Sequence, residues 1–213
     1  EDSLNYQPPK RSPQSPAQGD VQDAVKLLLN AKKPVIWSGM GVLFADATKE
    51  LQEFAELTEI PVYSTMPGKS SFDERHPLSL GAGSSSTSLP ARRWLQESDV
   101  LFAVGSSMTR TGYGQPIPDG KVIIHNVESI EDINKDFSVD VGLPGDAKLT
   151  LQTMINEVKS QAGDNGRKGQ TKVAEEIAEM RDAWMGEWTD LLNSDEIPIN
   201  TYRIIGELER TLD

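Results

Sequence analysis

The stretch PVIWSGMGVLFADATKEL, residues 34–51, places a short apolar run, a glycine turn and a helical pattern in direct succession. The first residues predict a buried strand, Gly39 and Gly41 a tight turn, and the residues from Asp46 onward a helix. A nucleotide site is built in this order, because glycines let the backbone approach a pyrophosphate closely. The third glycine of G-x-G-x-x-G is missing, since Phe44 stands there. The turn alone therefore fits both a dinucleotide loop and a purely structural one.

Strand-like and helix-like segments alternate along residues 20–158. A helix is expected to start at Asp20 as its N-cap, and another to begin near Leu149. Residues 66–90 are rich in Gly, Ser and Pro and are expected to form loops, with one short helix at residues 87–97. Further strands are expected within residues 60–65, 100–104, 121–129 and 139–147. The alternation predicts an α/β protein with a Rossmann-like doubly wound parallel sheet of about six strands flanked by helices.

The segments outside this core differ from it in composition. Residues 1–19 contain four prolines and predict an extended linker leaving a missing N-terminal domain. Residues 159–196 predict a polar linker and a C-terminal helical extension, in which Trp184 and Trp188 share a stripe suited to docking on another domain. Residues 197–213 predict the start of a missing C-terminal domain, because the last helical pattern runs to the end of the sequence without a cap.

Composition excludes several classes of function. The 213-residue chain has a formal net charge of −12 and a pI near 4.7, which disfavours nucleic acid and anionic membrane surfaces as partners. No cysteine is present, and the two histidines, His76 and His125, lie far apart in the sequence, so we expect no metal site in this chain. Each histidine is expected to be a hydrogen-bonded structural residue. We expect a cytoplasmic protein without a membrane span.

Five stretches in a fixed order carry a resemblance to a known family. They are AVKLLLNAKKPVIWSGMGV, LTEIPVYSTMPGKSSFDERHPLSLGAG, SDVLFAVGSSM, KVIIHNVES and LPGDAKLTLQTM, all within residues 20–158. Together they resemble the central domain of thiamine-diphosphate-dependent enzymes of the acetolactate synthase and pyruvate oxidase type. The terminal PINTYRIIGELERTLD resembles the opening of that family's third domain.

The resemblance implies a larger parent enzyme. Its first and third domains would bind thiamine diphosphate and Mg²⁺ across a homo-oligomer interface and act on 2-keto acids. The activating glutamate and the Gly-Asp-Gly motif of such enzymes are not found here; the nearest string, Gly145-Asp146-Ala147, lacks the last glycine. We therefore assign no catalytic and no metal-binding residue to this chain, and we expect it to be inactive in isolation.

In flavin-containing members of that family the central domain holds FAD, and the resemblance carries this site onto nine positions. These are Gly39, Gly41, Gly81, Ser84, Gly105, Ser106, Arg110, Asn126 and Glu128. Glycine N–H groups and Arg110 suit a pyrophosphate, and Glu128 suits ribose hydroxyls. Arg110 is one arginine where the acetolactate synthases have two, and Asn126 replaces an acid. FAD or ADP is therefore less expected than no nucleotide.

Two other interpretations stay open beside the central domain of a larger enzyme. One is a free-standing module that binds FAD or an adenine nucleotide through the same loops. The other is a purely structural spacer and dimerisation domain, with Trp184 and Trp188 docked on its neighbours.

Overall fold

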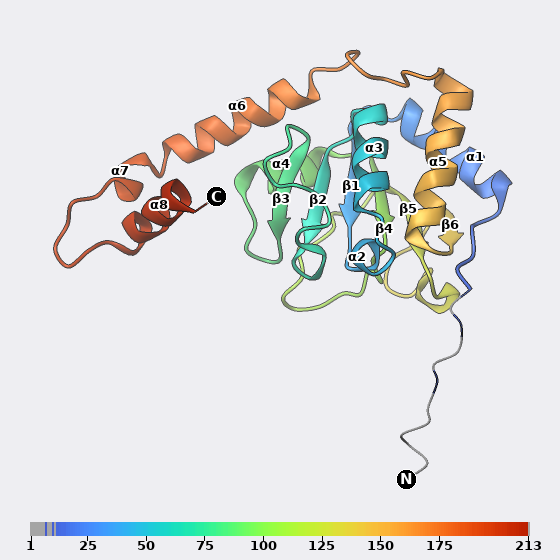
Figure 1. Cartoon of the computed structure of the whole chain (residues 1–213), viewed down its shortest axis with the longest axis horizontal. Helices are drawn as coiled ribbons and strands as arrows, with labels where there is room; N and C mark the ends of the chain where they lie inside the picture. Colours follow the sequence, from blue (N-terminus) through green and yellow to red (C-terminus); the bar gives the residue numbers. More distant parts are fainter. Residues whose placement is uncertain (1–6, 8–9, 11, 213) are drawn as a thin grey trace, which may run out of the picture.

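The computed structural model describes Gln7, Lys10 and residues 12–212, and its centre is a single parallel sheet (Figure 1). The strands lie in the order β3-β2-β1-β4-β5-β6, and each neighbouring pair is parallel. Their bounds are β1 Pro34–Ser38, β2 Val62–Thr65, β3 Ser79–Gly83, β4 Val100–Val104, β5 Val122–Val127 and β6 Val141–Pro144. The predicted doubly wound sheet is confirmed, with the direction of strand order reversing between β1 and β4.

Helices cover both faces of the sheet (Figure 1). The α-helices are α1 Gln18–Asn30, α2 Gly41–Phe44, α3 Thr48–Thr58, α4 Leu89–Glu97, α5 Ala147–Ala162, α6 Val173–Gly186, α7 Thr189–Leu192 and α8 Thr201–Thr211, and the 3₁₀ turns are η2 Met66–Gly68 and η3 Ile130–Asp132. Helices α1, α3 and α5 pack together against one face, while α4 and the start of α6 cover the other. The result is a three-layer α/β/α arrangement.

The strands are apolar at almost every position because both faces of the sheet are buried. On β1 and β4, Ile36 and Phe102 point into the core beneath α1, α3 and α5. The intervening residues Val35 and Leu101 point into the second core, beneath α4, which also contains the buried side chain of Trp94. Successive residues of a strand face opposite sides, so a parallel sheet covered on both faces needs continuous apolar runs.

Besides residues 66–78, which link β2 to β3 with only a 3₁₀ turn, two connections between parallel strands contain no α-helix. Residues 105–121 link β4 to β5, and residues 128–140 link β5 to β6. From these loops Ile117 and Phe137 pack against the second core, where a crossover helix would otherwise lie. The first of the two loops returns across the carboxyl edge of β4, and this segment shapes the candidate ligand-binding cleft.

The expectation of loops throughout residues 66–90 is wrong for β3. Its sequence, SLGAG, has few residues of high strand propensity, but it lies at the edge of the sheet and pairs with β2. The register shifts within this pairing, so that Tyr63 is opposite Gly81, and Gly81 adopts a φ of +84°. A glycine with positive φ suits such a bulge. Edge pairing thus overrides local propensity.

Two predicted helix boundaries also differ. Helix α1 starts at Gln18 with Ala17 as N-cap, so Asp20 lies in the first turn, where its charge still favours the helix dipole. The helical extension predicted within residues 159–196 is divided into α6 and α7, with Glu187 and Trp188 between them. The short helix α2, directly after the glycine turn, is separate from α3, which the sequence pattern does not indicate.

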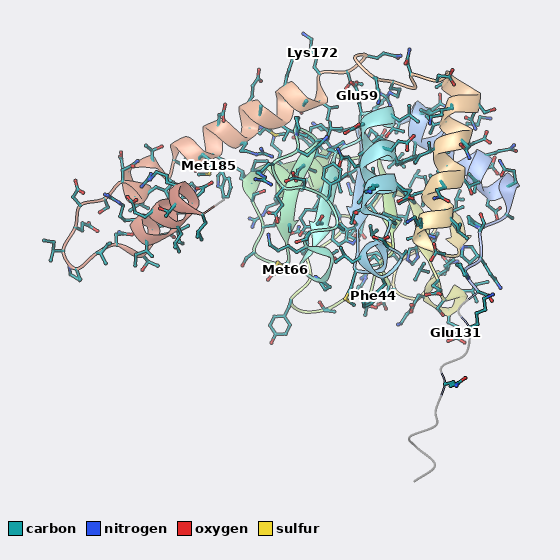
Figure 2. All side chains as sticks on the ribbon, in the orientation of Figure 1. Phe44, Glu59, Met66, Glu131, Lys172 and Met185 are labelled. Carbon is teal, nitrogen blue, oxygen red and sulfur yellow. The ribbon has the colours of Figure 1, made fainter. Side chains whose placement is uncertain are left out.

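Helix α6 leaves the sheet as an arm that carries α7 and α8 beyond β3 (Figure 1). Its first half is docked on the sheet: Ile177 is 1% exposed, and Arg181 donates to the carbonyl of Ser79 at 2.7 Å. Figure 2 labels Glu59 and Lys172 near its start. The carboxylate of Glu59 accepts the N–H groups of Gly169 and Thr171 at 2.6 and 2.7 Å. The approach to α6 is thus fixed by hydrogen bonds.

Beyond the docked half, α7 and α8 pack mainly on each other. Trp188 stacks on Tyr202 with ring centroids 5.2 Å apart, and Trp184 meets Trp188 edge-on at 6.4 Å. Ile205 and Leu208 of α8 are 52% and 50% exposed. The tryptophan stripe therefore serves contacts within the arm, and an apolar face of α8 stays uncovered by the described residues.

In the part of the chain that the structure describes, no helix combines the length and apolar character needed to cross a membrane.

Candidate ligand-binding cleft

A cleft of about 840 Å³ opens at the carboxyl edge of the sheet, beside the point where the strand order reverses. Ligands of open parallel sheets bind at this position, because the loops that leave neighbouring strands diverge there. Its walls come from the loops after β1, β2, β3 and β4, with Phe137 contributed by the loop after β5. Figure 2 shows Met66 and Phe44 at this same edge. A bond of 2.9 Å from the Ser85 N–H to the Tyr113 carbonyl joins the loops on two sides of the cleft.

Six of the nine predicted positions line this cleft. They are Gly39, Gly41, Ser84, Gly105, Ser106 and Arg110. Residues far apart in sequence are thus brought together by the fold, as the doubly wound topology requires. Their proposed role in binding a ligand stays a prediction.

The glycines of the turn pack against one another. A Cβ on Gly39 would lie 2.4 Å from the Gly105 carbonyl oxygen, and a Cβ on Gly41 would lie 2.7 Å from the Gly105 Cα. Gly105 itself has a φ of +59°, and its added Cβ would lie 2.5 Å from the Val42 nitrogen. These positions exclude side chains because two backbone loops are in direct contact. Loop packing alone is enough to explain the glycines.

The N–H groups of the turn are also mostly used within the protein. Gly39 N–H donates to the Val104 carbonyl at 2.9 Å, and Gly41 N–H donates to the Gly105 carbonyl at 2.7 Å. Val42 N–H donates to the Gly39 carbonyl at 3.2 Å. A pyrophosphate needs free donors at this place. Of the four N–H groups from Gly39 to Val42, that of Met40 alone is without an acceptor among the described residues.

The charge in the cleft comes from two side chains. Among the described lining residues, Arg110 is the one cation and Asp119 the one carboxylate. The backbone N–H of Arg110 donates to the carboxylate of Asp136 at 2.8 Å. The guanidinium of Arg110 lies 4.6 Å from the centroid of the Phe137 ring. This cation–π contact orients the guanidinium while leaving its N–H groups available to an anion.

The three remaining predicted positions do not line the cleft. Gly81 forms the bulge in β3 described above. Asn126 is fully buried, and its amide donates to the carbonyls of Leu143 and Gly145 and to the Thr150 hydroxyl at 2.9–3.1 Å. It joins β5, β6 and α5. Glu128 lies on the exposed surface just after β5, outside the lining residues.

Most of the apolar lining of the cleft was not predicted from the sequence. Trp37, Met40, Met66, Met108, Ile117 and Phe137 all contribute to it. Several of these residues stand at or directly after a predicted strand end, which was the available signal. The long loops that supply the others give no local pattern, so their side chains could not be placed from the sequence.

Residues 21–154 match the family model described as "Thiamine pyrophosphate enzyme, central domain", and this is more than half of the chain. The chain belongs to this family. The resemblance predicted from the five sequence stretches is therefore confirmed, and membership in a thiamine pyrophosphate enzyme family implies thiamine diphosphate as the cofactor of the whole enzyme.

Individual relatives agree with this assignment to the central-domain family. The chain is 32% identical over 200 residues to the probable acetolactate synthase large subunit of Methanococcus aeolicus. The aligned residues cover 91% of this chain and 33% of that protein. It is 36% identical over 160 residues to the acetolactate synthase large subunit of Corynebacterium glutamicum, covering 74% of this chain and 25% of that protein. It is also 30% identical over 180 residues to the 3D-(3,5/4)-trihydroxycyclohexane-1,2-dione hydrolase of Bacillus cereus, covering 84% of this chain and 27% of that protein. The chain spans about a third or less of the length of these relatives.

The fit of this central domain to an FAD-like group is partial. The cleft volume lies within the range of cofactor pockets, and Arg110 and the apolar walls suit an anion joined to an aromatic body. The expected anchors at the glycine turn and at Asn126 are occupied by protein hydrogen bonds. The donors that stay open lie instead on the loop after β4.

The two histidines of the central domain make the predicted hydrogen bonds. His76 shares a 3.3 Å hydrogen bond with Glu56 and accepts the Leu78 N–H at its Nδ1. His125 is 1% exposed, and its Nε2 donates to the Ser106 carbonyl at 2.7 Å. Its Nδ1 is buried without a partner among the described residues, and burial lowers the pKa of the imidazole. His125 thus connects the core to the cleft loop.

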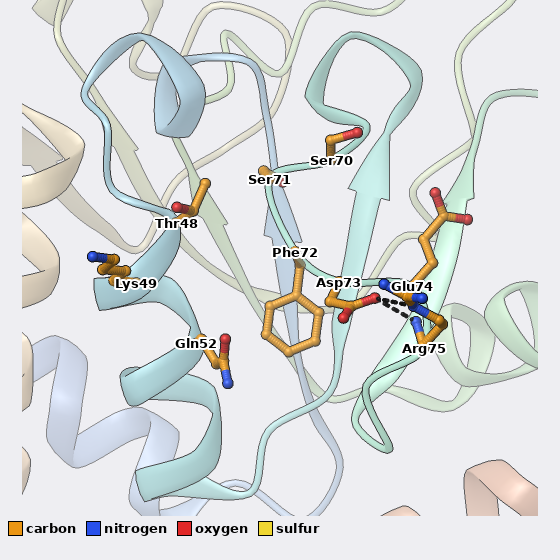
Figure 3. Close-up of a pocket in the computed structure, with 9 residues that line it drawn as sticks. All are labelled: Thr48, Lys49, Gln52, Ser70, Ser71, Phe72, Asp73, Glu74 and Arg75. Atoms are coloured by element: carbon orange, nitrogen blue, oxygen red, sulfur yellow. Dashed lines mark hydrogen bonds and ion pairs between the residues drawn. The ribbon is translucent and has the colours of Figure 1, made fainter. Parts of the chain in front are cut away.

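A second, shallower groove of about 450 Å³ lies between α3 and residues 70–75 (Figure 3). Lys49 and Gln52 line one side of it, and Phe72 stands between that side and the pair formed by Asp73 and Arg75. Asp73 accepts both the backbone N–H and the guanidinium Nε–H of Arg75, so the charges of this pair satisfy each other. We assign no binding role to this groove.

No three His, Asp or Glu side chains of the described residues approach one another closely enough to hold a metal ion. Asp146, in the string nearest to Gly-Asp-Gly, is instead the N-cap of α5: its carboxylate accepts the N–H groups of Lys148 and Leu149 at 3.0 and 3.1 Å. Capping of this kind stabilises the start of a helix. That this chain supplies no metal ligand stays a prediction.

Proposed function

We propose that this chain is the central domain of a thiamine-diphosphate-dependent, acetolactate-synthase-like enzyme that acts on 2-keto acids. The match of residues 21–154 to the central-domain family carries the proposal. The relatives with 32% and 36% identity are a probable acetolactate synthase large subunit and an acetolactate synthase large subunit. Their names favour a 2-keto acid as the substrate over the dione in the name of the hydrolase.

In this proposal the central domain connects two other domains. Residues 1–19 lead from an N-terminal domain, residues 159–196 form the connection onward, and residues 197–213 begin a C-terminal domain. The uncovered apolar face of α8, with Ile205 and Leu208, suits packing on that C-terminal domain. We further propose a homo-oligomeric enzyme in the cytoplasm, with Mg²⁺ bound beside the diphosphate.

Thiamine diphosphate, when bound by the other two domains, supplies the electron sink for decarboxylation of a 2-keto acid. The contribution of this chain is positional, since none of its described residues forms a cluster suited to that cofactor's metal. The rigid docking of α6 on the sheet would set the distance and direction between the domains that do the chemistry. We therefore assign no catalytic residue to the chain.

The test compares two proteins. The first is the 213-residue chain, assayed with pyruvate, thiamine diphosphate and Mg²⁺; the second is the product of the whole reading frame that contains it, translated on both sides in frame. We expect pyruvate consumption by the second and none by the first. Consumption of pyruvate by the 213-residue chain alone would contradict the proposal, as would a reading frame with no further domain.

The cleft favours a second role within the same domain, namely binding of a phosphate-bearing nucleotide such as FAD or ADP. A volume of about 840 Å³ at the reversal of strand order and one oriented arginine support it. The measurement is isothermal titration of the purified chain with ADP, FAD and FMN. Heat of binding that saturates supports the role, and no saturable heat with any of them leaves the domain a structural spacer.

A further inference from the structure

One short segment bridges the cleft and differs from the other walls in how it is held. Residues 111–116 belong to the connection between β4 and β5, and five of these six residues line the cleft. The loop after β3 faces them and contributes Gly83 and Ser84 to the lining. The Ser85 N–H donates to the Tyr113 carbonyl at 2.9 Å and joins the two walls. We call residues 111–116 the strap and this hydrogen bond the clasp.

Both ends of the strap are anchored to the domain. Before it, the Arg110 backbone N–H donates to the carboxylate of Asp136 at 2.8 Å, and the Arg110 guanidinium lies 4.6 Å from the Phe137 ring centroid. After it, Ile117 packs against the second core. Because both ends are fixed, motion of the strap is confined to the six residues between them and leaves the sheet undisturbed.

The middle of the strap makes few contacts. The Gly114 N–H donates to the Thr111 carbonyl at 3.3 Å and closes a β-turn within the strap. Tyr113 is 85% exposed, and a Cβ added to Gly112 would meet no atom within 4 Å. Among the described residues, the clasp is the one hydrogen bond that connects the strap to another segment. The closed position of the strap therefore depends on a single bond between two backbone groups.

A bond of this kind breaks easily. Ser85 and Tyr113 are both exposed, so water replaces the clasp when it opens, and one neutral hydrogen bond then contributes little net stability. Local openings that break few contacts occur in folded proteins far more often than global unfolding. Loops of this length move within nanoseconds to microseconds. We therefore expect the strap to open and close between its anchors while the sheet stays folded.

The exposure of the lining residues indicates an interior that the closed loops cover. Trp37 and Met108 line the cleft, yet each is 6% exposed. Met40 and Met66 also line it and are 42% and 52% exposed. Figure 2 shows Met66 at the carboxyl edge, where the cleft opens. The cleft thus has an accessible mouth and a covered inner part.

We propose that the strap is a lid over the cleft, closed by the clasp between Ser85 and Tyr113. In the closed position the lid limits how fast a small molecule reaches Trp37 and Met108, and opening of the clasp lets the loops after β3 and β4 separate. The lid sets the rates at which a ligand enters and leaves. This function of the lid rests on the proposed nucleotide-binding role of the cleft, whereas the motion of the lid does not.

The experiment measures access to the inner part of the cleft without a ligand. Hydrogen peroxide transfers an oxygen to an accessible methionine thioether, which becomes the sulfoxide, and leaves as water. Met108 reports on the inner part, and Met40 and Met66 are references within the same sample. Ser85→Pro removes the donor of the clasp. We expect oxidation of Met108 to become about fivefold faster, as loss of one hydrogen bond implies, while both references change little. Peptide mass spectrometry gives the three rates.

Two further variants separate the clasp from general damage to the loop. Ser86→Pro places proline in the same loop, but the Ser86 N–H has no acceptor among the described residues, so the Met108 rate should stay at that of the parent chain. Ser85→Cys with Tyr113→Cys introduces two cysteines into a chain that has none. Residues joined by a backbone hydrogen bond lie close enough for a disulfide. The oxidised form should protect Met108 more than the parent chain does, and the reduced and alkylated form should lose that added protection.

Several results would overturn the lid. Cysteines at positions 85 and 113 that do not join on oxidation would mean that the clasp is absent. Equal Met108 rates in the parent chain, Ser85→Pro and the oxidised double variant would mean that the strap does not control entry, as would equal effects of Ser85→Pro and Ser86→Pro. Thermal unfolding shows that each variant is folded. The nucleotide-binding role is decided separately by titration with ADP, FAD and FMN, since the Met108 rates need no ligand.

Discussion

At the residue scale, the glycines after β1 and β4 show how one sequence feature serves two physical purposes. Gly39, Gly41 and Gly105 bring two backbones into contact, and their N–H groups bond to neighbouring carbonyls. A dinucleotide loop also needs glycines, for close approach of a ligand. Here the approach is by another segment of the protein, so the glycines alone do not identify a nucleotide site.

The first prediction concerns the close contact at Gly105. Gly105→Ala adds a Cβ at positive φ and 2.5 Å from the Val42 nitrogen, whereas Gly120→Ala adds one at a φ of +82° with no atom within 4 Å. The conformational cost of roughly 1–2 kcal/mol is common to both, and the clash adds about 1–3 kcal/mol at Gly105 alone. Urea denaturation should show that larger loss of stability for Gly105→Ala. Equal losses would mean that the loops separate easily.

The second prediction concerns the buried imidazole of His125. Burial lowers its pKa from the ordinary value, so the folded protein holds the neutral form and the unfolded chain takes up the proton first as pH falls. The free energy of unfolding should therefore decrease as pH falls from about 7 to 5, through the unfolded pKa of about 6.5.

The variant His125→Gln provides the control for this pH dependence. It removes the titrating group but keeps a donor for the Ser106 carbonyl, so its stability should vary less between pH 7 and 5 than that of the parent chain. Urea midpoints at half-unit intervals of pH measure the difference. The same pH dependence in both proteins would show that other groups cause it.

At the element scale, edge pairing and missing crossover helices decide how the site is built. Strand β3 forms from the weak sequence SLGAG because β2 offers it a hydrogen-bonding partner. Residues 105–121 and 128–140 replace helices on one face of the sheet, and their side chains cover the second core. The cleft exists because a loop, unlike a helix, crosses the carboxyl edge of β4.

The third prediction tests whether α6 belongs to the folded core. Ile177 is 1% exposed on α6, whereas Ile205 is 52% exposed on α8. Ile177→Ala should lower stability by roughly 2–4 kcal/mol through loss of buried contacts, and Ile205→Ala should change it by less than about 0.5 kcal/mol. Urea denaturation measures both variants, and hydrogen exchange over residues 173–186 locates the effect. Fast exchange there in the parent chain would contradict a docked α6.

At the scale of the whole molecule, the structure divides into a sheet domain and a projecting arm (Figure 1). Helices α7 and α8 contact chiefly each other, through Trp188 and Tyr202 among others. Helix α6 connects the sheet to α7 and α8. In the proposed three-domain enzyme, the arm would contribute to the placement of the neighbouring domains more than to the stability of the sheet.

The fourth prediction rests on this division. Removal of residues 187–213 should shift the thermal midpoint of the main transition by less than roughly 3 °C, because few contacts join the arm to the sheet. Circular dichroism during heating measures the midpoint. Limited proteolysis of the intact chain should cut between α7 and α8 before it cuts the sheet domain. A much lower midpoint for the truncated chain would mean that the arm stabilises the sheet.

The sequence by itself determined the order of most strands and helices, the parallel sheet and the family, because continuous apolar runs and helical periodicity are local patterns that burial enforces. It did not indicate β3 or α2. It also brought Gly39, Gly105 and Arg110 to one edge, since the ends of parallel strands meet there. Tertiary structure alone decided which N–H groups of the cleft are left without an acceptor among the described residues. It also decided that the buried amide of Asn126 bonds to the Leu143 carbonyl and that His125 bonds to the Ser106 carbonyl. Hydrogen bonds between distant segments depend on how loops approach in space, and no local pattern of residues encodes that approach.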